Sequence, residues 1–454
     1  MELEGKNVLV FGSGLSGRGA LTLLEEQGAH VILYDSNGEL DEEEIRAQLP
    51  ASSDAQIRLG ELEEPLLTTL DLVVLSPGVP TDLPLIQKMK SLRLPVIGEV
   101  ELAYACGKGD VLAITGTNGK TTATTLLGEI MSRYMDDVFV VGNIGNPYTL
   151  VASQMTENSV VVAEMSSFQL ESIDKFHPKV SAILNIAPDH MNRHHTMDAY
   201  VEAKENIAKN QTKDDYCILN YEDEITEEFG EMVVATPVYF SSQRKLPIGI
   251  YMDHGTIYFR SPDHPEIEEE VCRTDELQVL GTHNYENVMA AAAMAAVFGV
   301  PMEVIREGVL AFKGVPHRIE FVAEKNGVAY YNDSKGTNPD AAIKGIEAMN
   351  RPTVLIGGGY DKGSSYTEWI QSFDGKVKKL ILIGATREKI AADADQCGFT
   401  DYEFADSFEE AMEKAVESAE EGDAVLLSPA CASWGMFTNY EERGDTFKAF
   451  VNEL

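Results

Sequence analysis

The stretch DVLAITGTNGKTT, residues 110–122, predicts a buried strand, a glycine-containing turn and the start of a helix. Leu126, Leu127 and Ile130 continue from it with helical spacing. Backbone amides in such a turn, together with the helix dipole, can hold phosphate oxygens, while Lys120 neutralises them. We therefore predict an α/β domain with a phosphate-binding loop formed by Gly116, Thr117, Asn118, Gly119, Lys120, Thr121 and Thr122, in which Thr121 ligates Mg²⁺.

This loop departs from the usual Walker spacing. The form G-x-x-x-x-G-K-T would place its first glycine at position 114, which is Ile114. A glycine turn with a lysine at a helix start also occurs in proteins that bind no nucleotide. By itself the loop therefore indicates phosphate binding, and a turn without a ligand remains an alternative.

Length and composition indicate a multidomain globular protein. A chain of 454 residues is long enough for about three domains, and 44% hydrophobic with 24% charged residues is typical of folded globular chains. The longest apolar stretch, residues 288–300, is shorter than the roughly 20 residues of a membrane span, so we expect a buried helix there. The N-terminus lacks the basic segment of a signal peptide, and we expect a cytoplasmic location.

Charge and cysteine content narrow the classes of partner. A formal net charge of −38 disfavours binding to nucleic acid or to anionic membrane surfaces, but small anionic ligands can still be held by local amides, lysines and Mg²⁺. Five cysteines without a C-x-x-C pair suggest neither a disulfide framework nor a zinc knuckle. We expect free, mostly buried thiols and small-molecule partners.

Alternating strand and helix patterns divide the chain into three α/β domains in series. The first, residues 1–98, contains strand patterns at 6–12, 30–35 and 70–78 and is expected to be Rossmann-like. The second, residues 99–314, is a P-loop-type domain with strand patterns at 110–116, 159–166 and 179–187 and an alanine-rich helix after Asn284. We expect ligands in clefts between the domains.

The third domain, residues 315–454, is also expected to be Rossmann-like. Its strand patterns lie at 328–332, 353–357, 379–384 and 424–428. The clearest helix covers residues 408–419, with apolar side chains at helical spacing. Ser407 and Glu410 are placed to form a capping box at its start.

The first domain carries a second phosphate-binding signal. Gly12, Gly14 and Gly17, followed by Asp35, match the dinucleotide fingerprint of a Rossmann unit and favour NAD when considered alone. A glycine turn at a helix N-terminus binds the pyrophosphate of any ligand, and Asp35 can accept hydrogen bonds from groups other than a ribose. NAD, another nucleotide and a turn without a ligand all remain open at this point.

The segment APDHMNRHH raises the question of a metal site. Asp189, His190, His194 and His195 include histidines four residues apart, but no further zinc ligand follows at a familiar spacing. His190 is better suited to a Mg²⁺ or substrate contact, and Glu164 at the end of another strand is a hard oxygen ligand, although it could equally be a solvated carboxylate.

Each of several other charged side chains can be interpreted as a surface residue when it is considered alone. Lys204 is typical of a solvated helix lysine. Arg318, Asp333, Lys335 and Lys362 could each be a surface charge, but all four fall in loops at predicted strand ends, where α/β proteins form their sites.

Taken together, nine motifs make the chain resemble the Mur ligase family over essentially its whole length. They are TGTNGKTT, GNIGNP, EMSSFQLE, LNIAPDHMNRH, GTHNYENVMAA, PHRIE, NDSKGTNP, GGGYDKG and SPACASWGMF. SSFQLE, DSKGTNP and SPACASW are most similar to the branch that adds D-glutamate to UDP-N-acetylmuramoyl-L-alanine. The resemblance implies a monomeric, ATP-dependent amide ligase of peptidoglycan precursor synthesis that works through an acyl phosphate.

The resemblance also implies roles for individual residues. The first domain would bind the UDP-linked substrate rather than NAD, through Gly14, Leu15, Ser16, Asp35, Ser36, Ser76, Pro77 and Gly78, with Asn143 and His190 from the second domain. ATP would contact the phosphate loop and His283, Asn284, Asn287, Arg318, Asp333 and Lys335. D-Glutamate would contact Thr337, Lys362, Ser433 and Tyr440, of which Tyr440 is matched by spacing alone.

Two Mg²⁺ sites are implied in the same way. Thr121 and Glu164 would hold one ion, and His190 with Lys204 the other, with Lys204 carbamylated so that it acts as a carboxylate-like ligand. The catalytic residues would be Lys120, His190, Lys204 and Arg318. Trp434 and Gly435 follow SPACAS where variation within the family is expected.

Overall fold

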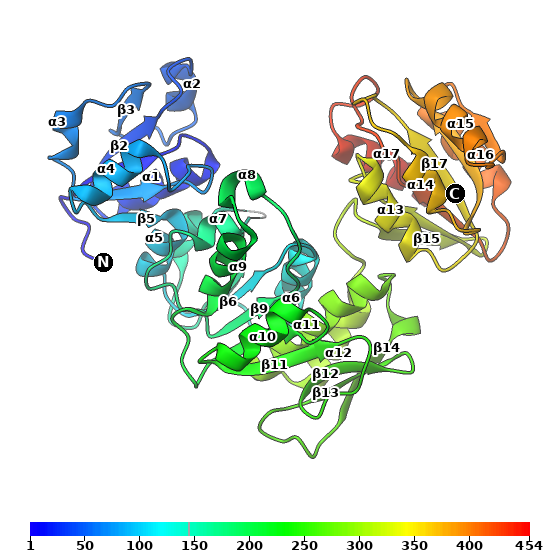
Figure 1. Cartoon of the computed structure of the whole chain (residues 1–454), viewed down its shortest axis with the longest axis horizontal. Helices are drawn as coiled ribbons and strands as arrows, with labels where there is room; N and C mark the ends of the chain where they lie inside the picture. Colours follow the sequence, from blue (N-terminus) through cyan, green and yellow to red (C-terminus); the bar gives the residue numbers. More distant parts are fainter. Residues whose placement is uncertain (144–145) are drawn as a thin grey trace. The chain divides into compact units, whose positions relative to one another are not determined.

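The computed structural model describes residues 1–143 and 146–454. Ile144 and Gly145, in the middle of the GNIGNP motif, lie outside the described residues. The described chain contains three sheets of five, nine and six strands, one in each of three α/β domains (Figure 1). The predicted fold class is confirmed.

The N-terminal sheet is fully parallel, with strand order β3-β2-β1-β4-β5. Val8–Phe11 of the central strand are buried, as expected for a strand covered on both faces. The elements are β1 (Asn7–Phe11), α1 (Leu15–Glu26), β2 (His30–Asp35), α2 (Glu42–Ala47), β3 (Gln56–Leu59), α3 (Glu64–Leu67), β4 (Leu72–Leu75), α4 (Pro84–Ser91) and β5 (Val96–Gly98).

The middle sheet has strand order β14-β13-β12-β11-β10-β9-β6-β8-β7. Along the part of the sheet with the order β12-β11-β10-β9-β6-β8-β7, every pair of neighbouring strands is parallel. Strand β12 pairs antiparallel with β13 on its other side. The strands are β6 (Asp110–Thr115), β7 (Val138–Gly142), β8 (Val160–Glu164), β9 (Val180–Ile183), β10 (Tyr216–Asn220), β11 (Thr236–Ser241), β12 (Gly249–Asp253), β13 (Thr256–Arg260) and β14 (Glu269–Arg273).

Helices of the middle domain connect these strands. They are α5 (Glu99–Cys106), α6 (Lys120–Tyr134), α7 (Ser167–Leu170), α8 (Met191–His194), α9 (Met197–Glu205), α10 (Glu224–Met232), α11 (Thr282–Phe298) and α12 (Met302–Ala311). Short 3-10 helices cover Tyr148–Leu150, Ala152–Gln154, Asn206–Ala208 and Thr274–Glu276. The alanine-rich part of α11 is buried, as the sequence predicted.

The C-terminal sheet has strand order β15-β16-β20-β17-β18-β19, parallel except for the pair β15–β16. Val354 and Leu355 lie in separate apolar clusters because successive strand residues face opposite sides of a sheet. The elements are β15 (Glu320–Lys325), β16 (Val328–Asn332), α13 (Pro339–Ala348), β17 (Thr353–Gly358), α14 (Thr367–Gln371), β18 (Val377–Ile383), α15 (Arg387–Gln396), β19 (Tyr402–Phe404), α16 (Phe408–Ser418), β20 (Ala424–Leu427) and α17 (Tyr440–Glu453).

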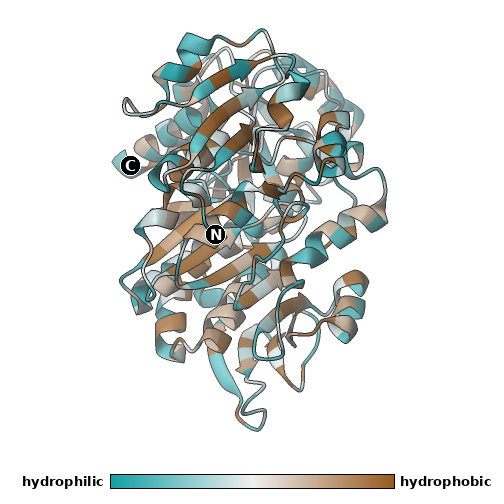
Figure 2. Ribbon diagram, turned by 90° about the vertical axis from the view of Figure 1, so that its left-hand side faces the viewer, coloured by the Kyte–Doolittle hydropathy of each residue, from teal (hydrophilic) through white to brown (hydrophobic). Residues whose placement is uncertain are grey.

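Hydropathy follows this layering. In Figure 2 the strands of the sheets are largely brown, whereas the connecting loops are mostly teal. Residues Met1–Cys272 with Glu286–Val309 form one compact unit, and Arg273–Tyr285 with Leu310–Leu454 form another. Within the first unit, one apolar cluster runs from Val8 of the N-terminal sheet to Val111 of the middle sheet, so these two domains share a core.

Several local predictions can be compared directly with the structure. The five cysteines are free, as predicted. The search for membrane-spanning helices finds none in the described part of the chain. Helix α16 begins after Ser407, whose hydroxyl accepts the Glu410 amide N–H, but the Glu410 carboxylate accepts from the backbone of Asp406 instead of Ser407. The predicted capping box is therefore half formed, because Glu410 reaches one residue further back.

Candidate active site

The loop between β6 and α6 takes a backbone path that requires glycine. Gly116 has φ +152° and Gly119 has φ +85°, both in the region that favours glycine. A Cβ atom on Gly119 would lie 2.1 Å from Oδ1 of Asn287 on α11. The loop therefore passes too close to α11 for any side chain at this position, and Asn287, a predicted ATP contact, lies beside it.

Residues after β9 hold the loop in place. The Thr117 amide donates to the Asn185 carbonyl at 2.9 Å, and the Asn118 amide donates to Oδ1 of Asn185 at 2.8 Å. The Thr117 hydroxyl lies 3.0 Å from the Tyr200 hydroxyl on α9. The sequence did not single out Asn185 or Tyr200, although Asn185 lies in the LNIAPDHMNRH motif.

Two lysines converge on one carbonyl of this loop. Lys120 Nζ donates to the Gly116 and Thr117 carbonyls at 2.9 Å, and Lys204 Nζ donates to the Gly116 carbonyl at 2.7 Å. The interpretation of Lys204 as a solvated helix lysine is wrong, because its side chain is 2% exposed and packs over the Tyr200 ring. Strand order brings α9 over the loop, which helical spacing alone does not reveal.

The surroundings of Lys204 favour its neutral form. Burial, followed by repulsion from Lys120, lowers the pKa of Lys204 to about 7, and Asp189 acts in the opposite direction. A large fraction of Lys204 is therefore an uncharged amine near neutral pH. That is the form in which a lysine is nucleophilic.

Glu164 presents an oxygen that nothing in the described chain satisfies. It ends β8, is 1% exposed, and accepts a hydrogen bond from Asn143 Nδ2 on Oε1 at 2.8 Å. Its other oxygen, Oε2, is buried without a hydrogen-bond partner among the described residues. Because a buried carboxylate oxygen without a partner is costly, this position fits a cation, and Mg²⁺ prefers such hard oxygen ligands.

The three histidines after β9 have separate partners. His190, at φ +54°, is exposed with Nε2 3.4 Å from Asp189. His194 is buried, with Nε2 2.9 Å from the Ser167 hydroxyl and Nδ1 3.2 Å from Glu171. His195 faces Asp82 at 3.3 Å. No group of three or more His, Cys, Asp or Glu side chains able to hold a metal occurs within residues 1–143 and 146–454.

A second site opens in the first unit as a cleft of about 560 Å³ at the carboxyl ends of β1, β2 and β4. Open parallel sheets bind ligands at such a position, where the strand order reverses. All the residues predicted to bind the UDP-linked substrate line this cleft except His190, and Gln169 of the middle domain lines it as well.

The glycine fingerprint shapes the floor of this cleft. A Cβ on Gly17 would lie 1.8 Å from the Gly12 carbonyl oxygen, so the third glycine allows α1 to approach the end of β1. Asp35 accepts from the Ser13 amide at 3.0 Å and the Ser13 hydroxyl at 2.8 Å. Burial acts to raise the pKa of Asp35, but these bonds and one from Asn37 outweigh it and lower the pKa, so Asp35 stays ionised at neutral pH.

Gln169 belongs to the cleft but was not predicted from the sequence. Its side-chain oxygen accepts the amide N–H of Ser166, and its Nε2 donates to Oε1 of buried Glu99 at 3.0 Å. Burial raises the pKa of Glu99 to about 7. The motif EMSSFQLE contains Gln169, yet only the fold shows that this side chain reaches the first domain.

In the second unit, Asp333 lies at the carboxyl end of β16. Its Oδ2 accepts from the Ser428 hydroxyl at 2.7 Å, and its Oδ1 accepts from the Ile319 amide at 3.3 Å. Burial raises the pKa of Asp333 to about 7. Gly336 and Gly345 leave room for this carboxyl, since a Cβ on either would lie within 3 Å of Oδ2.

We expect Asp333→Asn to change the pH dependence of stability. Because the pKa of Asp333 is raised from 3.8 to about 7 by folding, the folded chain binds more protons than the unfolded chain between these values, and the free energy of unfolding falls as pH rises through that window. Asparagine does not titrate, so the Asp333→Asn variant should lack this fall in the free energy of unfolding. Thermal melts from about pH 5 to pH 8 should show the wild type losing more stability than the variant, and parallel melting curves would contradict the assignment.

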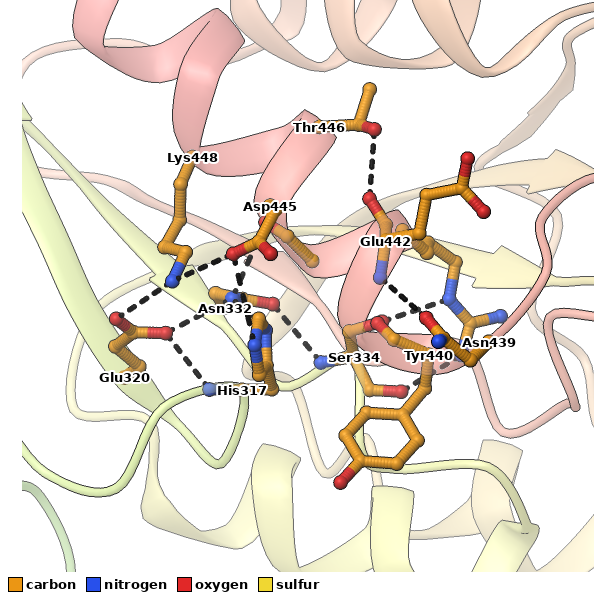
Figure 3. Close-up of polar contacts among 12 residues, drawn as sticks. His317, Glu320, Asn332, Ser334, Asn439, Tyr440, Glu442, Asp445, Thr446 and Lys448 are labelled. Carbon is orange, nitrogen blue, oxygen red and sulfur yellow. Dashed lines mark hydrogen bonds and ion pairs between the residues drawn. The ribbon is translucent and has the colours of Figure 1, made fainter. Parts of the chain in front are cut away.

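The turn that carries Arg318 is tied to the loop that carries Lys335. The Lys335 amide donates to the His317 carbonyl at 2.9 Å, and Nδ1 of His317 lies 3.1 Å from Nδ2 of Asn332. Figure 3 shows Glu320 beside His317 and Asn332, with Lys448 of α17 between Glu320 and Asp445. The exposed Arg318 therefore follows a firmly held residue.

A buried arginine joins the same loop to the loop after β20. Arg443 of α17 is 1% exposed and donates to the Ser334 hydroxyl at 2.9 Å, the Ser334 carbonyl at 2.8 Å and the Cys431 carbonyl at 3.2 Å. Burial lowers the pKa of Arg443 to about 10. No pattern in the sequence singled out Arg443, because an arginine one turn into a helix is usually exposed.

The residues predicted to hold the amino acid lie in three strand-end loops and at the start of α17. Thr337 follows Lys335, and Lys335 Nζ lies 5.7 Å from the ring centroid of Tyr440, whose ring points away from Ser334 (Figure 3). Ser433, 2% exposed, follows β20, and Lys362 follows β17. These last two loops are joined by the Tyr360 amide, which donates to the Ala432 carbonyl at 2.9 Å.

Of the remaining predicted ATP contacts, His283 and Asn284 belong to the second unit together with Arg318, Asp333 and Lys335. Asn287 and the phosphate loop belong to the first unit. Helix α11 begins in the second unit, and from Glu286 onward it belongs to the first.

Family models match all three domains. Residues 6–98 match the Mur ligase MurD-like N-terminal domain, residues 114–295 the Mur ligase middle domain, and residues 317–431 the Mur ligase glutamate ligase domain. Solved structures share the fold at low identity. UDP-N-acetylmuramate-alanine ligase from Thermotoga maritima aligns with a TM-score of 0.58 and 19% identity over 99% of both chains.

Curated relatives are similar over their full length. The UDP-N-acetylmuramoylalanine--D-glutamate ligase of Lachnoclostridium phytofermentans is 56% identical over 100% of this chain and 99% of the relative. The enzymes of the same name from Lachnospira eligens and Clostridioides difficile are 52% and 46% identical, each over 100% of both chains. With family models over all three domains and identities of this size, the chain belongs to the Mur ligase family.

Proposed function

We propose that this chain joins D-glutamate to UDP-N-acetylmuramoyl-L-alanine, with hydrolysis of ATP to ADP and phosphate, in peptidoglycan precursor synthesis. The observation that carries the proposal is the full-length identity of 56% to a relative named for this reaction. The convergence of Lys120 and Lys204 on the phosphate loop supports ATP chemistry at that position. We place the domain boundaries at residues 1–98, 99–314 and 315–454.

The cleft at β1, β2 and β4 suits the UDP part of the substrate. Amides of Gly14, Leu15 and Ser16 at the N-terminus of α1 can bind its pyrophosphate. Asp35 and Ser36, which line the same cleft, suit hydrogen bonding to the uracil, and Ser76, Pro77 and Gly78 complete the lining. Asn143 extends the cleft toward the middle domain, where the substrate carboxylate has to meet ATP.

The phosphate loop, with Lys120, would bind the ATP phosphates, and Asn287 would lie beside the nucleotide. His283, Asn284, Arg318, Asp333 and Lys335 would contribute from the second unit. Two Mg²⁺ ions would neutralise the phosphate charge. The Oε2 atom of Glu164, which has no hydrogen-bond partner among the described residues, supports one site, shared with Thr121. The partly neutral Lys204 supports a second, shared with His190 if Lys204 is carbamylated.

The reaction requires activation of a poor electrophile. The substrate carboxylate attacks the γ-phosphorus of ATP, the bond from this phosphorus to the β,γ-bridging oxygen breaks, and ADP leaves, so that an acyl phosphate forms. Lys120 and Arg318 would stabilise negative charge on the transferred group. The amine of D-glutamate then attacks the acyl carbon, phosphate leaves, and the nitrogen loses a proton. Thr337, Lys362, Ser433 and Tyr440 would orient the D-glutamate for this attack.

A product assay tests the reaction as a whole. The purified chain is incubated with ATP, Mg²⁺ and UDP-N-acetylmuramoyl-L-alanine plus one amino acid at a time: D-glutamate, L-glutamate, L-lysine or L-alanine. We expect a product mass increased by one glutamyl residue, and ADP release, with D-glutamate alone. Product with another amino acid and none with D-glutamate would assign the chain to a different reaction of the family.

Two accompanying properties are proposed on the same basis. We place the chain in the cytoplasm, where its nucleotide substrates are found, and we propose that it acts as a monomer. Calorimetry checks the competing interpretation of the first domain, because tight NAD binding without binding of the UDP-linked substrate would contradict the assignment of its cleft.

A further inference from the structure

Lys362 and Trp434 form an exposed pair in the second unit. The Lys362 ammonium lies 5.0 Å from the centroid of the Trp434 ring, and the Tyr360 ring meets Trp434 edge-on at 5.5 Å between centroids. Trp434 is 54% exposed, so the hydrophobic effect gives little reason for a tryptophan at this place. Instead, the face of its indole ring contacts the Lys362 ammonium.

The backbone fixes both members of this pair. Tyr360 forms a bridge with Ala432, which joins the loop after β17 to the loop after β20. Beyond Trp434 the chain turns at Gly435, with φ +86°, and the Phe437 amide donates to the Ser433 carbonyl at 3.0 Å. Trp434 is therefore held immediately next to buried Ser433, and Lys362 is two residues from the bridge.

The positive charge of Lys362 is not neutralised by a carboxylate within the described residues. Its neighbour Asp361 instead accepts from Lys389 at 3.2 Å on both oxygens and from the Gly363 amide at 2.7 Å. A ring face attracts an ammonium without cancelling its charge, and it restricts a side chain that would otherwise sample many rotamers. Lys362 is thereby oriented while it stays available to an anionic ligand.

We propose that Trp434 is a positioning residue for the amino-acid substrate: its ring holds the Lys362 ammonium ready to pair with a carboxylate of the incoming D-glutamate. The inference rests on the proposed function, which assigns Lys362 to that substrate. It adds Trp434 to the residues that act on this substrate, at a position where the family is expected to vary. It also predicts a specific change in the kinetics. Loss of the ring should weaken the binding of D-glutamate and leave the binding of ATP and of the UDP-linked substrate unchanged.

Steady-state kinetics of the Trp434→Leu variant test this prediction. A cation–π contact at an exposed site is weak, so we expect the KM for D-glutamate to rise about two- to fivefold, with kcat and the KM values for ATP and the UDP-linked substrate unchanged. Trp434→Phe should restore most of the affinity because it retains an aromatic face. An unchanged KM for D-glutamate in Trp434→Leu, or equal increases in all three KM values, would overturn the proposal.

A matched control and a double variant separate positioning from general damage. Phe404→Leu removes another exposed ring, at the end of β19, that faces a cation, Arg387 of α15 at 5.7 Å. This variant should leave the KM for D-glutamate unchanged. In a Lys362→Met background, Trp434→Leu should add nothing further, because the ring acts through Lys362. Full additivity of the two substitutions would contradict a shared role.

The outcomes distinguish this inference from the function on which it rests. If the wild-type chain makes no product with D-glutamate, the proposed function fails. If the wild type uses D-glutamate and Trp434→Leu behaves identically, the function stands and the positioning role is wrong.

Trp434 is one of two tryptophans, and the other, Trp369, is fully buried. A fluorescence change on addition of D-glutamate to the complex with ADP and the UDP-linked substrate should therefore disappear in Trp434→Phe.

Discussion

Lys120→Ala is expected to lower the ligation rate by about 10³-fold or more while the UDP-linked substrate binds with unchanged affinity. Lys120 carries a charge to the phosphate loop, where it would meet the γ-phosphate as negative charge develops. Lys120 does not line the cleft in the N-terminal domain, so binding there is independent of it. Product formation by mass spectrometry and calorimetric titration of the UDP-linked substrate measure the two properties separately.

Two further variants sharpen this prediction. The Lys120 ammonium donates to the Gly116 and Thr117 carbonyls, so alanine could also loosen the loop, and Lys120→Arg retains the charge while testing geometry. Lys88→Ala serves as the matched control, because Lys88 is a surface lysine paired with Glu64 in the N-terminal domain. Near-normal ligation by Lys120→Ala would refute the assigned role of the loop.

Lys204→Arg is expected to reduce ligation by about 10²-fold or more, because a carbamylated lysine would supply a negative metal ligand and arginine supplies a permanent positive charge. Carbamylation requires the neutral amine, which adds to carbon dioxide and releases one proton. With a pKa of about 7, the neutral fraction of Lys204 is about one tenth at pH 6 and about nine tenths at pH 8. An ordinary exposed lysine would remain almost fully charged over this range.

The wild-type chain should therefore lose activity in buffer freed of carbon dioxide and regain it when bicarbonate is added. A carbamate signal in ¹³C NMR after addition of ¹³C-bicarbonate should be present in the wild type, absent in Lys204→Arg, and retained in the control Lys209→Arg, which changes an exposed lysine nearby. Activity that is indifferent to carbon dioxide, with no such signal, would show that Lys204 acts as an unmodified amine.

Sequence patterns were most informative where one local requirement dominates. Parallel strands buried on both faces appear as continuous apolar runs, so β1, β2, β4, β6, β8 and β9 were recognised, whereas the strands from β10 to β14 were not. Strand β13, with residues alternating between buried and partly exposed, carries a weaker signal over its five positions. Strand order was also beyond the sequence, because pairing joins segments that are far apart in the chain.

The environments of individual side chains show the same limit. His194 looked like one half of a metal pair with His190, but in the structure it is buried against Ser167 and Glu171. Arg443 was not among the residues selected from the sequence, yet it links two loops of the C-terminal sheet. Each assignment depends on partners that a helical or strand period does not identify.

The sequence by itself determined the three α/β domains and both glycine turns, because these depend on short-range requirements: apolar runs, positive φ at Gly119, and the close approach that only Gly17 permits. The tertiary structure alone decided the chemistry of the charged groups. Burial lowers the pKa of Lys204 and leaves one oxygen of Glu164 without a hydrogen-bond partner among the described residues. Both effects arise from residues that folding brings together across long stretches of chain. Desolvation is a property of the packed interior, and no local pattern of residues records it.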